Sequence, residues 1–179
     1  MTAAQVIARA MPTVRILWAA LTASNVVFAA LSFVLVSGAS RPPPDVTVLG
    51  IGLAALVAAV ASFVLPLRVR GGRTATLAEP EPSAVGARGP ARFVDPAKAA
   101  RQAIARGQTG FIVSMALSES ISCDGLALHM IGAPHSSTLP FFVVGTALCL
   151  VRFPTRARLL GPYERLHGAT FAASEPGSY

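Results

Sequence analysis

Two carboxylates lie inside an otherwise apolar stretch of the chain, "SMALSESISCDGLALHMIG" at residues 114–132. Glu119 and Asp124 fall within a run from Phe111 to Ile131 that is long enough to cross a bilayer as a helix. An acid at the centre of such a helix costs about 2.5–3.5 kcal/mol on insertion scales. Each acid therefore needs a function, such as binding a proton or small cation, or a partner on a facing helix.

Helical spacing separates the two acids. Small or polar side chains recur along one face of this helix, in a stripe formed by Ser114, Ser118, Ser122, Gly125 and His129. Glu119 lies at the edge of this stripe, near Ser122, whereas Asp124 lies about 140° away from Glu119. We therefore expect no shared carboxylate dyad and no metal pair.

Glu119 is the first candidate for binding a proton or small cation, with Asp124, Ser122 and His129 as further candidates. Because burial favours the neutral form of a carboxyl, either acid could be protonated inside a membrane. The alternative is structural: a protonated Glu119 would donate a hydrogen bond to a facing helix and hold the bundle together. His129 lies near the end of the span, a position typical of an interfacial hydrogen-bonding residue rather than of a ligand.

The elements that must position these residues are four apolar segments, at residues 16–36, 46–67, 111–131 and 136–152. The chain is 53% hydrophobic and only 13% charged, against about 25% charged residues in a soluble domain. The pattern predicts an all-α integral membrane protein with four transmembrane helices. The first segment is about twice as long as the apolar core of a signal peptide, which favours a retained helix.

The net charge of +7 follows from the distribution of arginine and lysine around the spans. Basic residues precede the first span, fill the connection between the second and third spans, and follow the fourth span at Arg152, Arg156, Arg158 and Arg165. The positive-inside rule then places both termini in the cytoplasm, and we expect a bacterial inner membrane protein. The fourth segment is slightly short and could cross the bilayer if Arg152 extends its head group to the interface. The lipid bilayer is the expected partner, not nucleic acid.

The connection between the two pairs of spans is expected to contain a flexible linker and one short helix. Residues 71–94 are rich in Gly, Pro, Ala and charge, which is typical of a linker. Asp95 and Pro96 suit the start of a helix and Gly107 suits its end, which predicts a basic surface helix over residues 95–106. Residues 159–179 give no strong signal and are predicted to be a cytoplasmic tail.

The four spans suggest two helical hairpins, at residues 1–70 and 108–158, with some internal repetition. The second span ends in "LPLRVR" (65–70) and the fourth in "FPTRAR" (153–158), which fits a duplicated hairpin or a common stop sequence. The second span also carries a small residue at every fourth position, namely Gly50, Ala54, Ala58 and Ser62. With Gly125 of the third span, these residues are the predicted helix-packing positions, because small side chains allow close contact in lipid.

The third span resembles the ion-binding helix of the rotary ATPase proteolipid, subunit c. The matching positions are an Ala-Leu pair, an acid two residues later and a Gly-Leu pair, at Ala116, Leu117, Glu119, Gly125 and Leu126. "ARQ" (100–102) resembles the polar loop of that family, and "LGIGLAAL" (49–56) is similar to its glycine-rich helix. The resemblance implies proton or cation binding by Glu119, in a homo-oligomer or membrane complex.

Several features depart from the proteolipid pattern. Asp124 stands where the family has an aromatic or apolar residue, Ala103 replaces the loop proline, and two of the four spans are additional. The chain is therefore interpreted as a four-span bacterial membrane protein with a proteolipid-like third helix. No nucleophile–base pair, phosphate-binding loop or metal-ligand spacing is present in the sequence. We expect no enzyme and no cofactor; the alternative function is that of a structural or regulatory membrane subunit.

Overall fold

A computed structural model of the chain describes residues 1–35, 43–70, 77–78 and 92–171. Most of the expected linker at 71–94 lies outside the described residues, as does the end of the expected tail. The elements are α1 (Ala3–Val34), α2 (Asp45–Arg70), α3 (Pro96–Met130), α4 (His135–Val151) and α5 (Arg156–His167), with a two-residue antiparallel pair, β1 (Leu77–Ala78) and β2 (Arg92–Phe93). The predicted helical class is confirmed.

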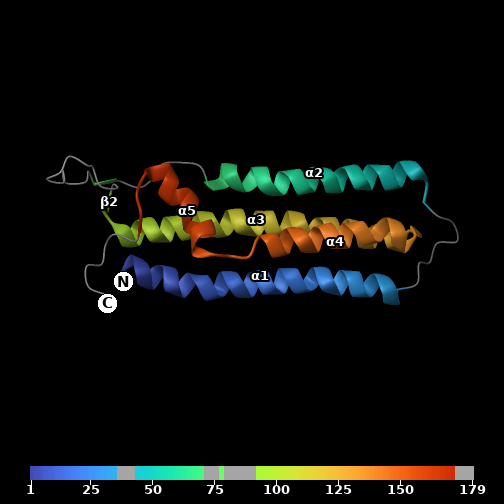
Figure 1. The fold of residues 1–179 in the computed structure, drawn as a ribbon, viewed down its shortest axis with the longest axis horizontal. Helices are drawn as coiled ribbons and strands as arrows, with labels where there is room; N and C mark the ends of the chain where they lie inside the picture. The colour runs from blue at the N-terminus through green and yellow to red at the C-terminus, as the bar shows by residue number, and fades with distance from the viewer. Residues whose placement is uncertain (36–42, 71–76, 79–91, 172–179) are drawn as a thin grey trace.

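Three of these helices, α1, α2 and α3, are long and apolar enough to cross a membrane. The fourth apolar segment forms α4, which has 17 residues and is followed after a short break by α5 at an angle of 66°. The long helices lie roughly side by side and give the molecule an elongated shape (Figure 1). We call the end where α1 and α3 begin the α5 end, and the end where α3 turns into α4 the turn end.

Helix α3 is the centre of the bundle, because it packs against α1, α2, α4 and α5. Figure 1 shows α3 and α4 between α1 and α2, so the first two spans do not form a packed hairpin of their own. The two proline motifs, which suggested a duplicated hairpin, also differ in local structure. Pro66 lies inside α2, whereas Pro154 lies in the break where the chain turns from α4 to α5.

The expected short helix over residues 95–106 is the beginning of α3 instead. Its predicted start is as expected, since the Asp95 side chain accepts a hydrogen bond of 2.9 Å from the Lys98 backbone N–H and Pro96 takes the first position. The predicted end at Gly107 is wrong: the helix continues to Met130. Gly107 allows α5 to pack closely against α3, because a Cβ atom there would lie 2.8 Å from the Leu159 carbonyl oxygen of α5.

The segment at 159–179, which carries no strong signal in the sequence, contributes most of α5. Thr155 caps its start by accepting from the Arg158 backbone N–H, and Gly168 ends it in the left-handed conformation, at φ 61°. One face of α5 is buried against α3, and the ring of Tyr163 in α5 lies 5.9 Å from that of Phe93. A cluster of buried apolar residues lies here, with Val6, Ile7, Val14, Phe93, Ile104, Leu159, Leu160, Tyr163 and Phe171 among its members.

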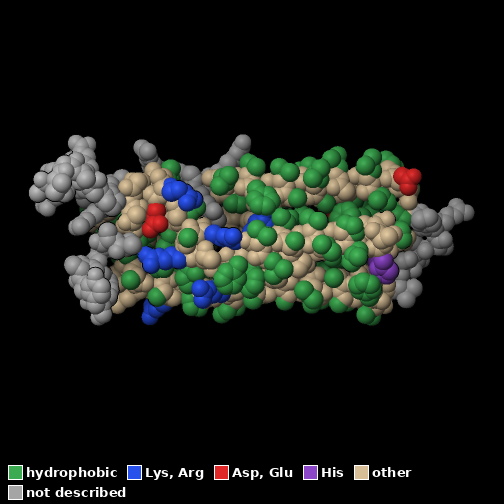
Figure 2. All heavy atoms as spheres, in the orientation of Figure 1, with side chains coloured by type: hydrophobic (Ala, Val, Ile, Leu, Met, Phe, Trp, Pro, Cys, Tyr) green, Lys and Arg blue, Asp and Glu red, His purple; other side chains and the backbone are tan. Residues whose placement is uncertain are grey.

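Away from the α5 end, large apolar side chains are mostly on the outside. Exposed Val, Leu, Ile and Phe residues run along α1 from Ile16, along α2 from Val46 to Leu67, and along α4 from Leu139. Figure 2 shows this apolar surface over most of the length of the bundle, with Lys and Arg gathered toward the α5 end. The buried side chains between these helices include the serines at positions 32, 62, 114, 118 and 122, Asn25 and Thr138.

The packing face of α2 is rotated from the predicted one. Gly50 and Ala54 are exposed and Ala58 is half-buried, whereas Ala55 and Ser62 are buried. A Cβ atom at Gly50 would meet no neighbour within 4 Å. Ser62 is the one predicted position that lies in the interface, where its hydroxyl and carbonyl oxygens accept hydrogen bonds from Arg152 and Ser114. These two hydrogen bonds, and not the small-residue pattern, indicate which face of α2 is turned toward the bundle.

The close contact at Gly107 gives a test of the α3–α5 packing. Replacing Gly107 with Val places methyl groups against the Leu159 carbonyl, so we expect a loss of about 1–3 kcal/mol of stability from overpacking. The matched control is Gly52→Val, since a Cβ at Gly52 meets nothing within 4 Å. Thermal melting of both variants in detergent measures the difference, and equal melting midpoints would contradict the packing described.

Candidate functional site

Glu119 lies half-buried on α3 and contacts α1. Its Oε1 atom accepts a short hydrogen bond from the hydroxyl of Ser24, and the same hydroxyl lies 2.8 Å from the Leu21 carbonyl oxygen. A serine hydroxyl has one proton, so it can donate to only one of these two acceptors at a time. Glu119 is therefore held at a helix interface by a group that can act either as a donor or as an acceptor toward it.

Asn25, the residue after Ser24, joins three helices. Its side chain is fully buried, and its Nδ2 donates to the Leu21 carbonyl at 2.8 Å and to Cys149 Sγ of α4 at 3.4 Å. Its Oδ1 accepts a short hydrogen bond from Ser122 of α3. Both ends of the amide are thus satisfied, as a buried amide in a membrane requires.

Helix α4 approaches this layer closely because it has a glycine there. A Cβ atom at Gly145 would lie 3.0 Å from the Ser118 carbonyl oxygen and 3.2 Å from Asn25 Oδ1. Trp18 of α1 adds a bond from its indole N–H to the Cys149 carbonyl, at 2.9 Å. The polar layer is thereby closed between α1, α3 and α4.

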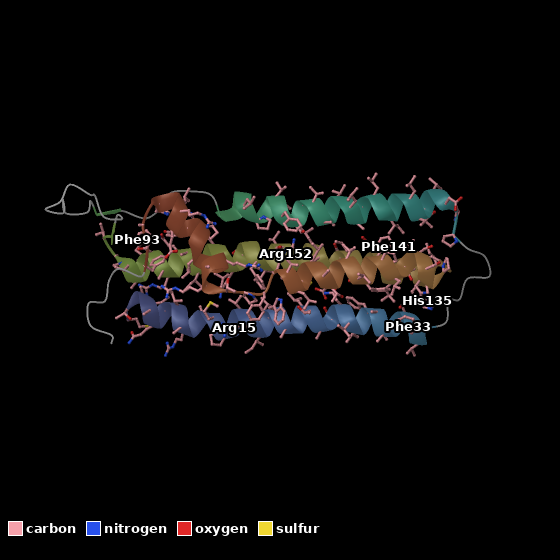
Figure 3. The ribbon with its side chains drawn as sticks, viewed as in Figure 1. Arg15, Phe33, Phe93, His135, Phe141 and Arg152 are labelled. Atoms are coloured by element: carbon pink, nitrogen blue, oxygen red, sulfur yellow. The ribbon has the colours of Figure 1, made fainter. Side chains whose placement is uncertain are left out.

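Arg152, which follows the last residue of α4, turns into the bundle. Its guanidinium donates to Ser118 of α3 at 2.5 Å, to Ser62 of α2 at 2.6 Å and to the Leu148 carbonyl at 3.1 Å. The ring of Phe63 lies 4.5 Å from the guanidinium carbon, a cation–π distance. The Arg152 head group is therefore held between helices, where serines of two other helices accept its hydrogen bonds. Figure 3 shows Arg152 in the middle of the helix bundle.

The stripe predicted on α3 is buried along its whole length, at Ser114, Ser118, Ser122, Gly125 and His129. Ser122 binds Asn25, as described above. Gly125 lies at the crossing with α4, where a Cβ atom would be 2.7 Å from Phe141 Cβ. Among the predicted candidates, the structure brings Glu119 and Ser122 together in one layer with Ser24 and Asn25. Gly125 serves packing.

The other predicted candidates lie apart from this layer. Asp124 is half-buried and makes no hydrogen bond to the residues that the structure describes. His129 lies at the turn end, where its Nε2 is 2.9 Å from the Leu35 carbonyl oxygen and its ring stacks on that of His135 at 4.6 Å. His135 in turn stacks on Phe33, so His129 belongs to an aromatic stack between α1 and the turn (Figure 3).

Three residues of the site, Ser24, Asn25 and Arg152, were not predicted from the sequence. Ser24 and Asn25 interrupt an apolar span in "ALTASNVV", which is the signal that could have drawn attention to them. Arg152 ends an apolar segment, where a basic residue is ordinarily explained by topology. Within the described ranges, no group of three or more His, Cys, Asp or Glu side chains is placed to hold a metal ion.

Comparison with protein-family models, with curated proteins and with solved structures finds no match for the chain. The site is therefore interpreted from its own geometry.

The Asn25–Ser122 pair can be measured by a double-mutant cycle. We expect Asn25→Ala and Ser122→Ala to destabilise the protein, with a coupling free energy of about 0.6 kcal/mol and at most about 1.7 kcal/mol, as for other hydrogen bonds between membrane helices. Thermal or denaturant unfolding in detergent supplies the free energies. A matched cycle between Asn25 and Asp124, which do not contact each other, should give none. Additive effects at Asn25 and Ser122 would contradict the geometry.

Proposed function

We propose that the chain is a polytopic membrane protein that binds and releases a proton at Glu119. The observation that carries the proposal is the contact between Glu119 and Ser24, in which one hydroxyl faces both a carboxyl and the Leu21 carbonyl. With Glu119 ionised, Ser24 donates to it. With Glu119 protonated, the carboxyl donates to Ser24, whose own proton then points to the Leu21 carbonyl.

This arrangement can accommodate both protonation states with a single rotation of a hydroxyl. In a medium without water, a polar group that loses its hydrogen bond on titration would resist the change by several kcal/mol. Here neither state leaves the Glu119–Ser24 contact broken. The half-buried position of Glu119 also leaves its side chain partly accessible from outside the bundle.

A proton suits this site better than a metal cation. Hard cations such as Ca²⁺ take about six to eight oxygen ligands. Glu119 has one side-chain oxygen partner among the described residues, the hydroxyl of Ser24. The resemblance of α3 to the proteolipid helix supports the same assignment, because it gives the equivalent acid an ion-binding role.

The proposed topology has four spans, with α4 as the fourth and both termini in the cytoplasm of a bacterium. The apolar surface of α4 supports this count, as does its position alongside α3. The gathering of Lys and Arg at the α5 end supports the orientation, since basic residues favour the cytoplasmic side. In this arrangement α5 and the first turns of α1 and α3 form a cytoplasmic part.

A second candidate function is that of a structural or regulatory membrane subunit. The Asn25 layer favours it, because this amide links α1, α3 and α4 through hydrogen bonds from both of its ends. In that case the Glu119–Ser24 contact would be one more interhelical bond. The two candidates differ in whether Glu119 exchanges its proton with the surroundings.

Labelling with a hydrophobic carbodiimide separates the two functions. This reagent reacts with a protonated carboxyl, so the proposal predicts pH-dependent modification of Glu119 in reconstituted protein. Glu119→Gln should abolish the labelling, and Asp124→Asn should leave it intact. If Glu119 stays unmodified at every pH, and Glu119→Gln lowers only the melting temperature, proton exchange is ruled out and the structural function is favoured.

Accessibility to a membrane-impermeant thiol reagent tests the four-span topology. The two native cysteines lie within α3 and α4, so a single cysteine is added in each variant. We expect Ser136→Cys, at the turn end, to react in intact cells. Arg156→Cys, at the start of α5, should react only after the cells are permeabilised. Reaction of both positions from the same side would contradict a crossing by α4.

A further inference from the structure

A groove of about 510 Å³ lies at the α5 end, where α2 passes the bend between α4 and α5. Apolar residues from four helices line it, including Phe63 and Leu67 of α2 and Phe111 of α3. Three arginines, Arg152, Arg158 and Arg165, also line it, and no carboxylate does among the residues that the structure describes. An apolar groove with an excess of positive charge suits an anionic amphiphile.

Two of these arginines are presented by the same face of α5. Arg158 and Arg165 are seven residues apart, which is about two helical turns, and both side chains are exposed. Arg158 uses one nitrogen for the Val151 and Phe153 carbonyls at the end of α4. The Arg165 side chain has no hydrogen bond or ion pair within the described part of the chain. Both guanidinium groups thus have N–H donors left for an anion.

Arg152 forms the inner end of the groove and carries a charge without a counter-ion. Its hydrogen bonds go to two serine hydroxyls and a backbone carbonyl, and no described carboxylate forms an ion pair with it. A half-buried cation among apolar helices is costly unless a negative charge lies nearby. An anion in the groove would supply that charge.

The position of the groove along the bundle indicates the source of the anion. The described exposed apolar surface of α2 reaches Leu67, and that of α3 begins at Ile112, next to Phe111 of the groove wall. The groove therefore spans the boundary between the apolar surface and the basic α5 end. Phe63 and Leu67, both more than half exposed, continue it onto the lipid-facing side of α2.

From this juxtaposition we propose that the groove binds one anionic phospholipid. Its phosphate lies between Arg158 and Arg165 and its charge balances that of Arg152, while an acyl chain lies along Phe63 and Leu67. The site is distinct from Glu119, which lies on the α1 side of α3 and takes no part in it. Lipid binding here would also hold α5 against the end of α2.

Native mass spectrometry of the full chain tests the proposal, after exchange into nanodiscs that contain phosphatidylglycerol and phosphatidylcholine. We expect the wild type released from the discs to retain phosphatidylglycerol in preference to phosphatidylcholine. Each arginine near a lipid head group contributes roughly a fivefold change in affinity. Arg165→Gln should therefore weaken retention roughly fivefold, and the double variant with Arg158→Gln should weaken it roughly 25-fold.

The control is Arg156→Gln, because Arg156 is an exposed arginine of the same helix that does not line the groove. It removes the same charge, so retention equal to that of the wild type is expected. If Arg156→Gln and Arg165→Gln lose phosphatidylglycerol equally, retention depends on net charge alone, and the proposed site is wrong. Unselective retention of both lipids would also overturn it.

Two further measurements make the result decisive. The Arg165 side chain makes no hydrogen bond or ion pair within the described part of the chain, so Arg165→Gln should keep the wild-type melting temperature, and a loss of lipid with intact folding then reports on binding. Inorganic phosphate, added to protein in discs of phosphatidylcholine alone, distinguishes a soluble anion from a head group. If phosphate binds and Arg165→Gln weakens this binding as much as it weakens lipid retention, the groove is a site for a free anion. That result would contradict the proposal.

Discussion

The polar face of α3 can be accommodated in a bilayer only if it points into the bundle, and the rest of the structure follows from that constraint. Three serines at four-residue spacing each bind a different helix. Ser114 donates to the Ser62 carbonyl of α2, Ser118 accepts from Arg152 at the end of α4, and Ser122 donates to Asn25 of α1. Lipid tails are as apolar as leucine, so such bonds and close packing, rather than the hydrophobic effect, hold these helices together.

The molecule has two parts with different interiors. Between the spans, serines, Asn25 and Thr138 are buried beside a few large apolar side chains such as Met115, Ile121 and Leu128, and most other large apolar side chains face outward. At the α5 end, apolar and aromatic side chains such as Ile7, Phe93 and Leu160 are buried together, as in a water-soluble domain. Helix α3 runs through both parts without interruption and contacts α5.

Of the helix interfaces described above, the sequence allowed only the α3 face to be predicted. The 3.6-residue period of α3 identifies its polar stripe, because periodicity is a property of a single helix. It does not identify the partners of that stripe, which depend on how α1, α2 and α4 are rotated. On α2 the small-residue spacing pointed to Gly50 and Ala54, whereas the buried face includes Ala55, about 100° further round the helix.

The other differences have the same origin. Arg152 ends an apolar segment, and its turn into the bundle depends on acceptors at Ser62 and Ser118 that are distant in sequence. Gly107 has the chemistry of a helix end, but its role is set by the backbone of α5, more than 50 residues later. Local signals such as the Asp95 cap were predicted correctly, because both partners of that bond lie within one helical turn.

Disulfide cross-linking across the α2–α3 interface tests the account most directly. Ser114 Oγ lies 3.0 Å from the Ser62 carbonyl oxygen, so cysteines at positions 62 and 114 should form a disulfide on mild oxidation in native membranes. The comparison is a pair at positions 54 and 114, because Ala54 is exposed and faces away from the interface. Cross-linking of the first pair alone is the predicted result. Cross-linking through position 54, or none at either pair, would show that the polar face of α3 is not turned toward α2 and would contradict the account.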